Sequence, residues 1–272
     1  MREYREFLNK VLRRVRGEVL SRLNPYFFRE VGKGAGGDST LMIDKVAEEL
    51  ILENIRSAFP NSTVVSEESG VVEVGKGGPP FVIVDPIDGS LNATRDFLKF
   101  SISIAIAEGK RLSDVSAGGV MDVRCGDFFE AYRGFGVFVN GKRVKTSKVK
   151  QVEEAIISIP ITHYAKASKL DILTSLLNVA KRVRNLGSTS LELSYVGAGI
   201  FDAFVDLSGR TRNVDIAAAY LIVKEGGGVI LSGEMEELDG RVDTITDLSV
   251  LAASSSELAN SIFSLIKGVK LS

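Results

Sequence analysis

The sequence predicts a mixed α/β fold in which helices lie on β-sheet. Residues 1–150 combine helical patterns with strands that follow one another directly, which indicates helices on a largely antiparallel sheet. Residues 151–272 alternate strand and helix patterns, which indicates helices layered on a sheet. With 272 residues, 44% of them hydrophobic, the chain can bury a large core as one domain or as two tightly joined halves. No repeat or low-complexity linker separates the halves, so the boundary near residue 150 is soft.

The first predicted helix spans Met1–Leu23, where apolar residues recur at the spacing of an amphipathic helix. They are Phe7, Leu8, Val11, Leu12, Val15, Val19 and Leu20. We expect this apolar stripe to pack on the body of the protein. Arginines make the stretch similar to a transit peptide, but Glu3, Glu6 and Glu18 argue against one, and we therefore expect a cytoplasmic protein.

A glycine-rich stretch, Val31–Asp38, predicts a mobile lid loop, because its glycines cannot hold a packed element. It lacks the ending of a P-loop and the strand-first order of a dinucleotide site. Asp38, Ser39 and Thr40 can cap a following helix that Pro60 closes, which places Asp44 near its beginning. The buried face of that helix is expected to be Val46, Ala47, Leu50, Ile51, Ile55 and Phe59.

Two short apolar strands, Thr63–Val65 and Phe81–Val84, each run directly into acidic residues. Glu67 and Glu68 follow the first strand, and Asp85 follows the second. Acidic residues at two strand ends indicate a functional site. The other strands expected in this half are 100–107, 115–123 and 128–132, with a two-residue hairpin turn at 140–141.

The second half predicts strands and helices in alternation from about residue 155. The expected strands are 156–159, 183–186, 201–207, 229–231 and 248–253, and the expected helices are 170–180, 191–196, 216–224 and 258–266. His163 and Tyr164 fall in an expected loop after Pro160, where a surface or structural role is favoured over a place in a sugar pocket.

The charge balance disfavours nucleic acid and anionic membranes as main partners, because 34 Lys and Arg residues nearly match 35 Asp and Glu residues. No apolar run approaches the ~18 residues of a membrane span. The single cysteine, Cys125, cannot form an intramolecular disulfide and is expected to be a buried small hydrophobe. A small solute is therefore the expected partner.

The run Asp85-Pro86-Ile87-Asp88 predicts a metal site. Proline fixes its own φ and steers Asp85 towards extended geometry, so that the chain turns at the strand end. Both carboxylates and the Ile87 carbonyl can then converge on one point. Oxygen ligands of this kind suit Mg²⁺ or Mn²⁺ better than zinc or copper.

A phosphate-binding turn is predicted directly after these acids. Gly89 allows a ligand to approach the backbone, and Ser90 can begin a helical turn with free N–H groups. A cation site beside an anion-binding turn is what metal-assisted phosphoryl transfer requires.

The alternative is ordinary turn chemistry, because Asp-Pro and Asp-Gly pairs are common in surface turns. Asp215 likewise has a simpler interpretation, as an acid that the dipole stabilises at a helix N-terminus. The combination of two acidic strand ends with Asp215 at the head of an apolar helix favours function. Converging carboxylates repel one another, so such a site makes physical sense only with metal bound.

At these residues the chain resembles the inositol monophosphatase family, in particular archaeal-type enzymes that also act on fructose 1,6-bisphosphate. The resemblance covers nearly the whole chain and implies a layered αβαβα sandwich that is commonly a homodimer. It rests on residues 38–44, Ser66–Ser69, Val84–Asn92, Asn140-Gly141, Gly187–Thr189, Val214–Ala219 and Glu225–Gly228.

The resemblance implies a site with two or three Mg²⁺ ions. Glu67, Asp85 and the Ile87 carbonyl would hold one ion, Asp85, Asp88 and Asp215 would hold a second, and a weaker third would lie near Glu67. Glu67 thereby also counts among the catalytic residues.

The resemblance also implies which residues handle water and phosphate. Asp44 and Ser90 would orient the attacking water, and the N–H groups of Gly89 and Ser90 would bind the phosphate. Asp38 and Lys33 would close over that phosphate from the glycine-rich loop. Gly187 and Ser188 would line the substrate side.

Two departures from the family pattern put strict inositol specificity in doubt. Val214 stands where an aromatic residue often precedes the last ligand aspartate, and Ser208 falls near the family's acidic inositol-contacting position. Arg210 and Arg212 could pair with a second phosphate, or they could be solvent-facing loop charges.

The predicted function is a Mg²⁺-dependent phosphatase that hydrolyses a phosphorylated sugar or polyol, with fructose 1,6-bisphosphate and inositol 1-phosphate as candidate substrates. Two alternatives stay open. One is a phosphatase of the same superfamily for 3′-phosphoadenosine 5′-phosphate, although the chain has no Trp to clamp adenine. The other is a non-catalytic relative that binds RNA or a transcription factor.

Overall fold

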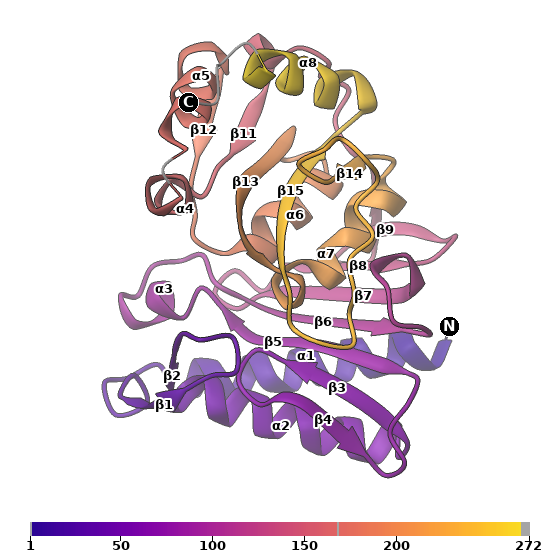
Figure 1. Cartoon of the computed structure of the whole chain (residues 1–272). Coiled ribbons are helices and arrows are strands. Elements are labelled where there is room, and N and C mark those ends of the chain that lie inside the picture. The colour runs from indigo at the N-terminus through magenta and orange to yellow at the C-terminus, as the bar shows by residue number, and fades with distance from the viewer. Residues whose placement is uncertain (1, 168, 268–272) are drawn as a thin grey trace.

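The computed structural model describes residues 2–167 and 169–267 and shows alternating layers of helix and sheet in the order αβαβα (Figure 1). The helices are α1 (Arg2–Ser21), α2 (Met42–Ala58), α3 (Ser90–Thr94), α4 (Ile161–Lys166), α5 (Leu170–Val179), α6 (Thr189–Gly197), α7 (Asn213–Gly226) and α8 (Ser256–Lys267). The strands are β1 (Glu30–Lys33), β2 (Ser39–Leu41), β3 (Ser62–Ser66), β4 (Gly70–Val74), β5 (Phe81–Asp88), β6 (Ser101–Ala107), β7 (Val115–Asp122), β8 (Phe128–Tyr132), β9 (Gly136–Val139), β10 (Lys142–Val144), β11 (Ile156–Ser158), β12 (Arg182–Arg184), β13 (Ala203–Arg212), β14 (Val229–Leu231) and β15 (Asp247–Ala253). The predicted mixed α/β sandwich is confirmed.

The larger sheet has eight strands in the order β10-β9-β8-β7-β6-β5-β3-β4, and only β3 and β5 are parallel neighbours. The predicted antiparallel character is therefore confirmed. In the parallel pair, Ser66 lies opposite Val84. Because the carboxyl ends of parallel strands meet at one edge, Glu67 and Asp85 emerge side by side.

Helices cover both faces of this sheet (Figure 1). α1 and α2 pack on one face, and the predicted apolar stripe of α1 is buried from Phe7 to Val19, with Met1 outside the described residues. α6 and α7 pack on the other face. There α7 approaches β7 so closely that a Cβ on Gly118 would lie 2.6 Å from the Ala218 carbonyl oxygen.

The smaller sheet has five strands in the order β12-β11-β13-β15-β14 and lies on the far side of α6 and α7. Its outer face is covered by α4, α5 and α8. β11 runs parallel to β12 and β13, so the carboxyl ends of all three point the same way. This arrangement brings the segment after β12 and the end of β13 towards the Glu67 and Asp85 edge of the larger sheet.

Three local expectations around the site are wrong. β5 does not end at Val84 but continues to Asp88 through a register shift, where Pro86 can donate no ladder hydrogen bond. Residues 31–33 of the glycine-rich stretch form part of β1, which pairs with β2, and do not lie in a loop. The mobility of the remaining residues stays a prediction. Helix α2 begins only at Met42 with Leu41 as N-cap, so residues 38–40 do not cap it and instead lead into or form β2.

Three residues outside the site also differ from expectation. Cys125 is exposed, because the turn after β7 curls around Asp122, which accepts the Cys125 N–H at 2.8 Å. His163 and Tyr164 lie on α4 rather than in a loop, and the Tyr164 ring is fully buried, which confirms a structural role for it. Among the described residues, no helix is long and apolar enough to cross a membrane.

Candidate active site

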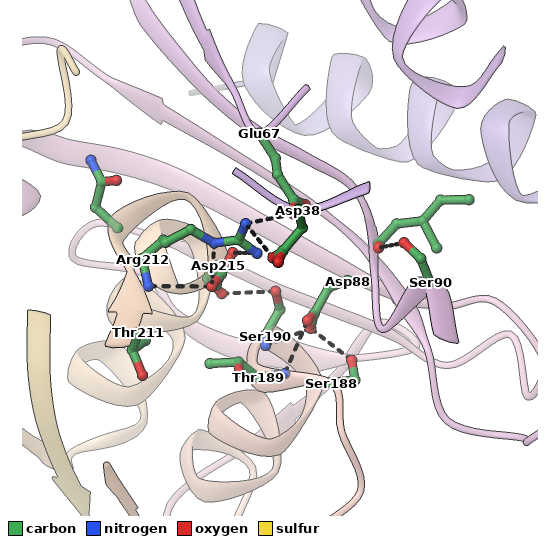
Figure 2. Close-up of polar contacts among 12 residues, drawn as sticks. Asp38, Glu67, Asp88, Ser90, Ser188, Thr189, Ser190, Thr211, Arg212 and Asp215 are labelled. Carbon is green, nitrogen blue, oxygen red and sulfur yellow. Dashed lines mark hydrogen bonds and ion pairs between the residues drawn. The ribbon is translucent and has the colours of Figure 1, made fainter. Parts of the chain in front are cut away.

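Three acidic side chains from separate elements converge at the edge where β3 ends. Figure 2 shows two of them, Glu67 and Asp215. Glu67 follows β3, Asp85 belongs to β5, and Asp215 lies in the first turn of α7. One carboxylate oxygen of each lies within 4.8 Å of the others. The structure thus brings together three of the predicted metal ligands from both halves of the chain.

Asp85 is the strongest indication that this cluster binds a cation. Its side chain is fully buried, and neither carboxylate oxygen has a hydrogen-bond partner among the described residues. Burial, with the nearby charges of Glu67 and Asp88, raises the pKa of Asp85 well above its ordinary value. A buried carboxylate without a partner is costly, and an oxygen-binding divalent cation would remove that cost.

Arg212 supplies positive charge to the same cluster (Figure 2). Its Nη1 lies 2.7 Å from Glu67 Oε1, and its Nη2 lies 3.2 Å from Asp215 Oδ1. Burial raises the pKa of Glu67 to about 8 even though Arg212 opposes the shift. Burial also raises the pKa of Asp215 against the same opposition. Protonation of these acids and binding of a cation are therefore competing ways to relieve the repulsion.

The two predicted arginines differ in their surroundings. The Arg212 side chain is only 16% exposed, so its interpretation as a solvent-facing loop charge is wrong. Arg210 is exposed, and its Nη2 donates to the Lys166 carbonyl at 3.4 Å. Whether either side chain contacts a second phosphate stays a prediction.

Asp88 lies beside the cluster and is held by the N-terminus of α6 (Figure 2). Its Oδ2 accepts the Ser188 hydroxyl at 2.7 Å and the Ser190 N–H at 2.7 Å, and its Oδ1 accepts the Thr189 N–H at 3.1 Å. Burial and the charge of Asp215 raise the pKa of Asp88 to about 6, and these hydrogen bonds limit the increase. The second half of the chain therefore orients this carboxylate.

Asp44 and Ser90, the residues predicted to orient water, are in direct contact. Ser90 Oγ lies 2.9 Å from Asp44 Oδ1 and 3.0 Å from the Ile87 carbonyl oxygen. A hydroxyl has one hydrogen, so donation to Asp44 leaves the Ile87 carbonyl free for another ligand. Asp44 Oδ2 accepts the Leu41 N–H at 2.8 Å, and burial raises the pKa of Asp44 to about 7.

The helical turn predicted after the acids is present at the start of α3. Gly89 precedes the helix with φ of 93°, and a Cβ there would lie 2.7 Å from the Gly187 carbonyl oxygen. The predicted residues Gly89 and Gly187 therefore lie against each other. Ser90 is the first residue of α3, whose opening N–H groups have no intrahelical acceptor.

The β1 and β2 hairpin lies over the cluster. The Gly36 N–H donates to the Glu67 carbonyl at 2.9 Å, and Asp38 Oδ2 lies 3.2 Å from Arg212 Nη1. Asp38 therefore contacts the candidate metal site from above (Figure 2). Lys33 lies on β1, exposed beside a small hollow that it lines with Thr40 and Glu68.

Some functional neighbours were not predicted from sequence. Ser101, Thr189 and Ser190 surround Asp88, and Arg212 pairs with the metal-site carboxylates rather than with solvent. The Ser-Thr-Ser run at residues 188–190 is a typical helix start, which could have indicated an anion-binding N-terminus. No local pattern reveals which anion occupies it.

The comparisons agree with this arrangement. The inositol monophosphatase family model matches residues 1–270. A fructose-1,6-bisphosphatase/inositol-1-monophosphatase of Methanothermobacter thermautotrophicus is 36% identical over 234 residues, which cover 83% of this chain and 82% of that protein. A solved structure of an inositol monophosphatase and fructose 1,6-bisphosphatase superposes with a TM-score of 0.82 at 30% identity, covering 96% of this chain and 99% of the other.

Membership of the family does not by itself decide between substrates or roles. The Nus factor SuhB of Escherichia coli strain K12 is 32% identical over 204 residues, which cover 74% of each chain. The geometry of the site is therefore needed to distinguish between substrates and between roles. From the match over almost its entire length and from the αβαβα fold, the chain belongs to the inositol monophosphatase family.

Proposed function

We propose that this protein is a Mg²⁺-dependent phosphatase that hydrolyses phosphate monoesters of small polyols, with fructose 1,6-bisphosphate and inositol 1-phosphate as substrates. The names of the archaeal relative and of the similar solved structure support these substrates. The observation that carries the proposal is Asp85, a fully buried carboxylate with no partner among the described residues, flanked by Glu67 and Asp215.

The carboxylates fit a hard divalent cation in number, type and spacing. Glu67, Asp85 and the Ile87 carbonyl would hold one Mg²⁺, and Asp85, Asp88 and Asp215 would hold a second. Mn²⁺ has the same preference for oxygen ligands. When bound, the metal acidifies water and stabilises charge on the phosphate and leaving oxygens.

Asp44 and Ser90 would orient the attacking water. The Ser90 hydroxyl donates to Asp44 Oδ1 and leaves its own oxygen free to accept a hydrogen bond. With a pKa near 7, Asp44 can accept a proton at neutral pH, which suits a general base that acts through Ser90.

Backbone groups would bind the phosphate. The N–H groups of Gly89 and Ser90 lie at the start of α3, next to the candidate metal ligand Asp88. Arg210 would contact the second phosphate of a bisphosphate, because it lies on the exposed bulge of β13 near Arg212. We also expect a homodimer, which sedimentation can check.

The test is phosphate release from fructose 1,6-bisphosphate, inositol 1-phosphate and 3′-phosphoadenosine 5′-phosphate, with Mg²⁺ and with EDTA. We expect Mg²⁺-dependent turnover with the largest kcat/KM on the first two substrates. A preference for the adenosine phosphate would overturn the substrate assignment. No metal-dependent release from any of them would favour a non-catalytic binding role.

A further inference from the structure

Leu186, which precedes the segment that holds Asp88, is itself held from two sides. The Leu186 N–H donates to Glu192 Oε1 at 2.7 Å, and the Leu186 carbonyl accepts from Asn92 Nδ2 at 2.7 Å. Glu192 belongs to α6 and Asn92 to α3, so the two hydrogen bonds come from separate helices. Neither residue is among the predicted ligands.

Glu192 is only 1% exposed, and a glutamate is unusual at such a buried position. The same Oε1 that accepts the Leu186 N–H also accepts the Ser158 hydroxyl at 2.5 Å. Burying a carboxylate is costly, and an apolar residue would pack there at lower cost. The two accepted hydrogen bonds therefore point to a positional requirement at Leu186.

The residues that follow Leu186 in the chain carry the hydrogen-bond donors that hold Asp88. Gly187 turns the chain with φ of 76°, and Ser188 then occupies the N-cap position of α6. The Ser188 hydroxyl and the N–H groups of Thr189 and Ser190 all end on the Asp88 carboxylate. A shift of Leu186 would move these donors together and rotate Asp88 away from the cluster.

We propose that Glu192 is a positioning residue for the metal site, with Asn92 holding the opposite side of the same turn. Together they fix Leu186, so that the start of α6 presents Asp88 to the second cation. The inference rests on the proposed function, because that function makes Asp88 a metal ligand. Glu192 touches neither metal nor substrate and acts through the backbone of residues 186–190.

The test measures Mn²⁺ binding to the whole protein without substrate, from the electron paramagnetic resonance signal of free Mn²⁺. Glu192→Leu removes the acceptor for the Leu186 N–H at similar side-chain size. We expect Mn²⁺ affinity at the second cation site, which includes Asp88, to fall about tenfold, as for other outer residues of metal sites. Glu192→Gln keeps an acceptor oxygen and should restore affinity to within about twofold of wild type.

Glu130→Leu is the matched control. Glu130 is another buried glutamate, 2% exposed on β8, and it accepts the Tyr132 hydroxyl at 2.6 Å without contacting the site. We expect this variant to lose thermal stability while it keeps wild-type Mn²⁺ affinity. If Glu192→Leu and Glu130→Leu both bind Mn²⁺ like wild type, the inference is wrong.

A second variant covers the case in which Glu192→Leu does not fold. Asn92→Leu breaks the carbonyl side of the turn at a half-buried position and should weaken Mn²⁺ binding in the same direction. Unchanged affinity in a folded Asn92→Leu protein would overturn the proposal. The wild-type protein tests the proposed function separately from this inference. If the wild-type protein binds no Mn²⁺, the proposed metal site itself is wrong.

Discussion

Arg212 Nη1 lies 2.7 Å from Glu67 Oε1, so a guanidinium stands at the point where the candidate metal ligands meet. Arg212 also pairs with Asp215 on its own helix turn and with Asp38 on the hairpin above. Its charge favours the ionised form of Glu67 and Asp215 and opposes the effect of burial. Arg212 and a divalent cation therefore compensate the same negative charge.

Replacing Arg212 should destabilise the protein mainly when metal is absent. We expect Arg212→Met at pH 8 in EDTA to lower the free energy of unfolding by about 3 kcal/mol, because it leaves buried carboxylates uncompensated. The loss should shrink with saturating Mg²⁺. Urea denaturation with and without Mg²⁺ measures both values. Arg210→Met is the control, since Arg210 contacts only a carbonyl oxygen among the described residues and its loss should change stability little.

Asp85→Asn should separate stability from activity. We expect phosphate release to fall at least about 100-fold, since the amide is a poor metal ligand. The metal-free variant should be at least as stable as wild type, because the amide carries no charge to desolvate. Thermal unfolding should also show that Mg²⁺ raises the Tm of wild type but not of the variant. Near-normal turnover in Asp85→Asn would exclude Asp85 as a ligand.

The stability of the metal-free protein should fall as pH rises. The pKa values of Asp88, Asp44 and Glu67 are raised to about 6, 7 and 8, so the native state binds more protons than the unfolded state between about pH 4 and pH 8. The destabilisation is absent below the unfolded pKa values and is complete above the folded ones. Urea unfolding in EDTA at pH 5, 6.5 and 8 measures this slope. A stability that rises over this range would contradict the burial of these carboxylates.

Mg²⁺ should weaken or reverse the same pH dependence, because it binds the ionised carboxylates and binds more tightly as they deprotonate. The Mg²⁺ concentration that gives half-maximal stabilisation should therefore decrease from pH 6 to pH 8. Isothermal titration calorimetry at both pH values, with proton release measured in two buffers, checks the coupling.

Removing the Ser90 hydroxyl should slow the chemical step more than it weakens metal binding. We expect Ser90→Ala to lower kcat about 100-fold, the usual scale for a group that positions a reacting proton, while Mn²⁺ affinity changes less than about threefold. Asp44→Asn should give a similar loss and should flatten any rise of kcat near pH 7, because its pKa is raised to about 7. If Ser90→Ala keeps full kcat, this dyad does not orient the attacking water.

Sequence patterns alone predict most of the elements and nominate most of the candidate site residues. The spacing of apolar residues located most strands and helices, because it reflects which side chains face the core. Acidic residues after two apolar stretches indicated the site. The structure explains why this pattern is informative, because β3 and β5 are parallel neighbours whose carboxyl ends meet at one edge of the sheet. β4 was not predicted, because its side chains alternate between partly buried and exposed at the edge of the sheet and leave a weak pattern.

The contacts that hold these residues depend on how the elements pack together and cannot be predicted from local sequence. Asp85 and Asp88 lie on either side of a register shift between β5 and β6. Asp88 accepts hydrogen bonds from α6, and Arg212 pairs with Glu67. Each of these contacts joins segments that are not neighbours in the sequence. Local sequence patterns depend on residues a few positions apart. These contacts instead depend on how the two sheets pack against the helical layer of α6 and α7 between them. Which charges lie together, and hence which pKa values shift, follows from that packing alone.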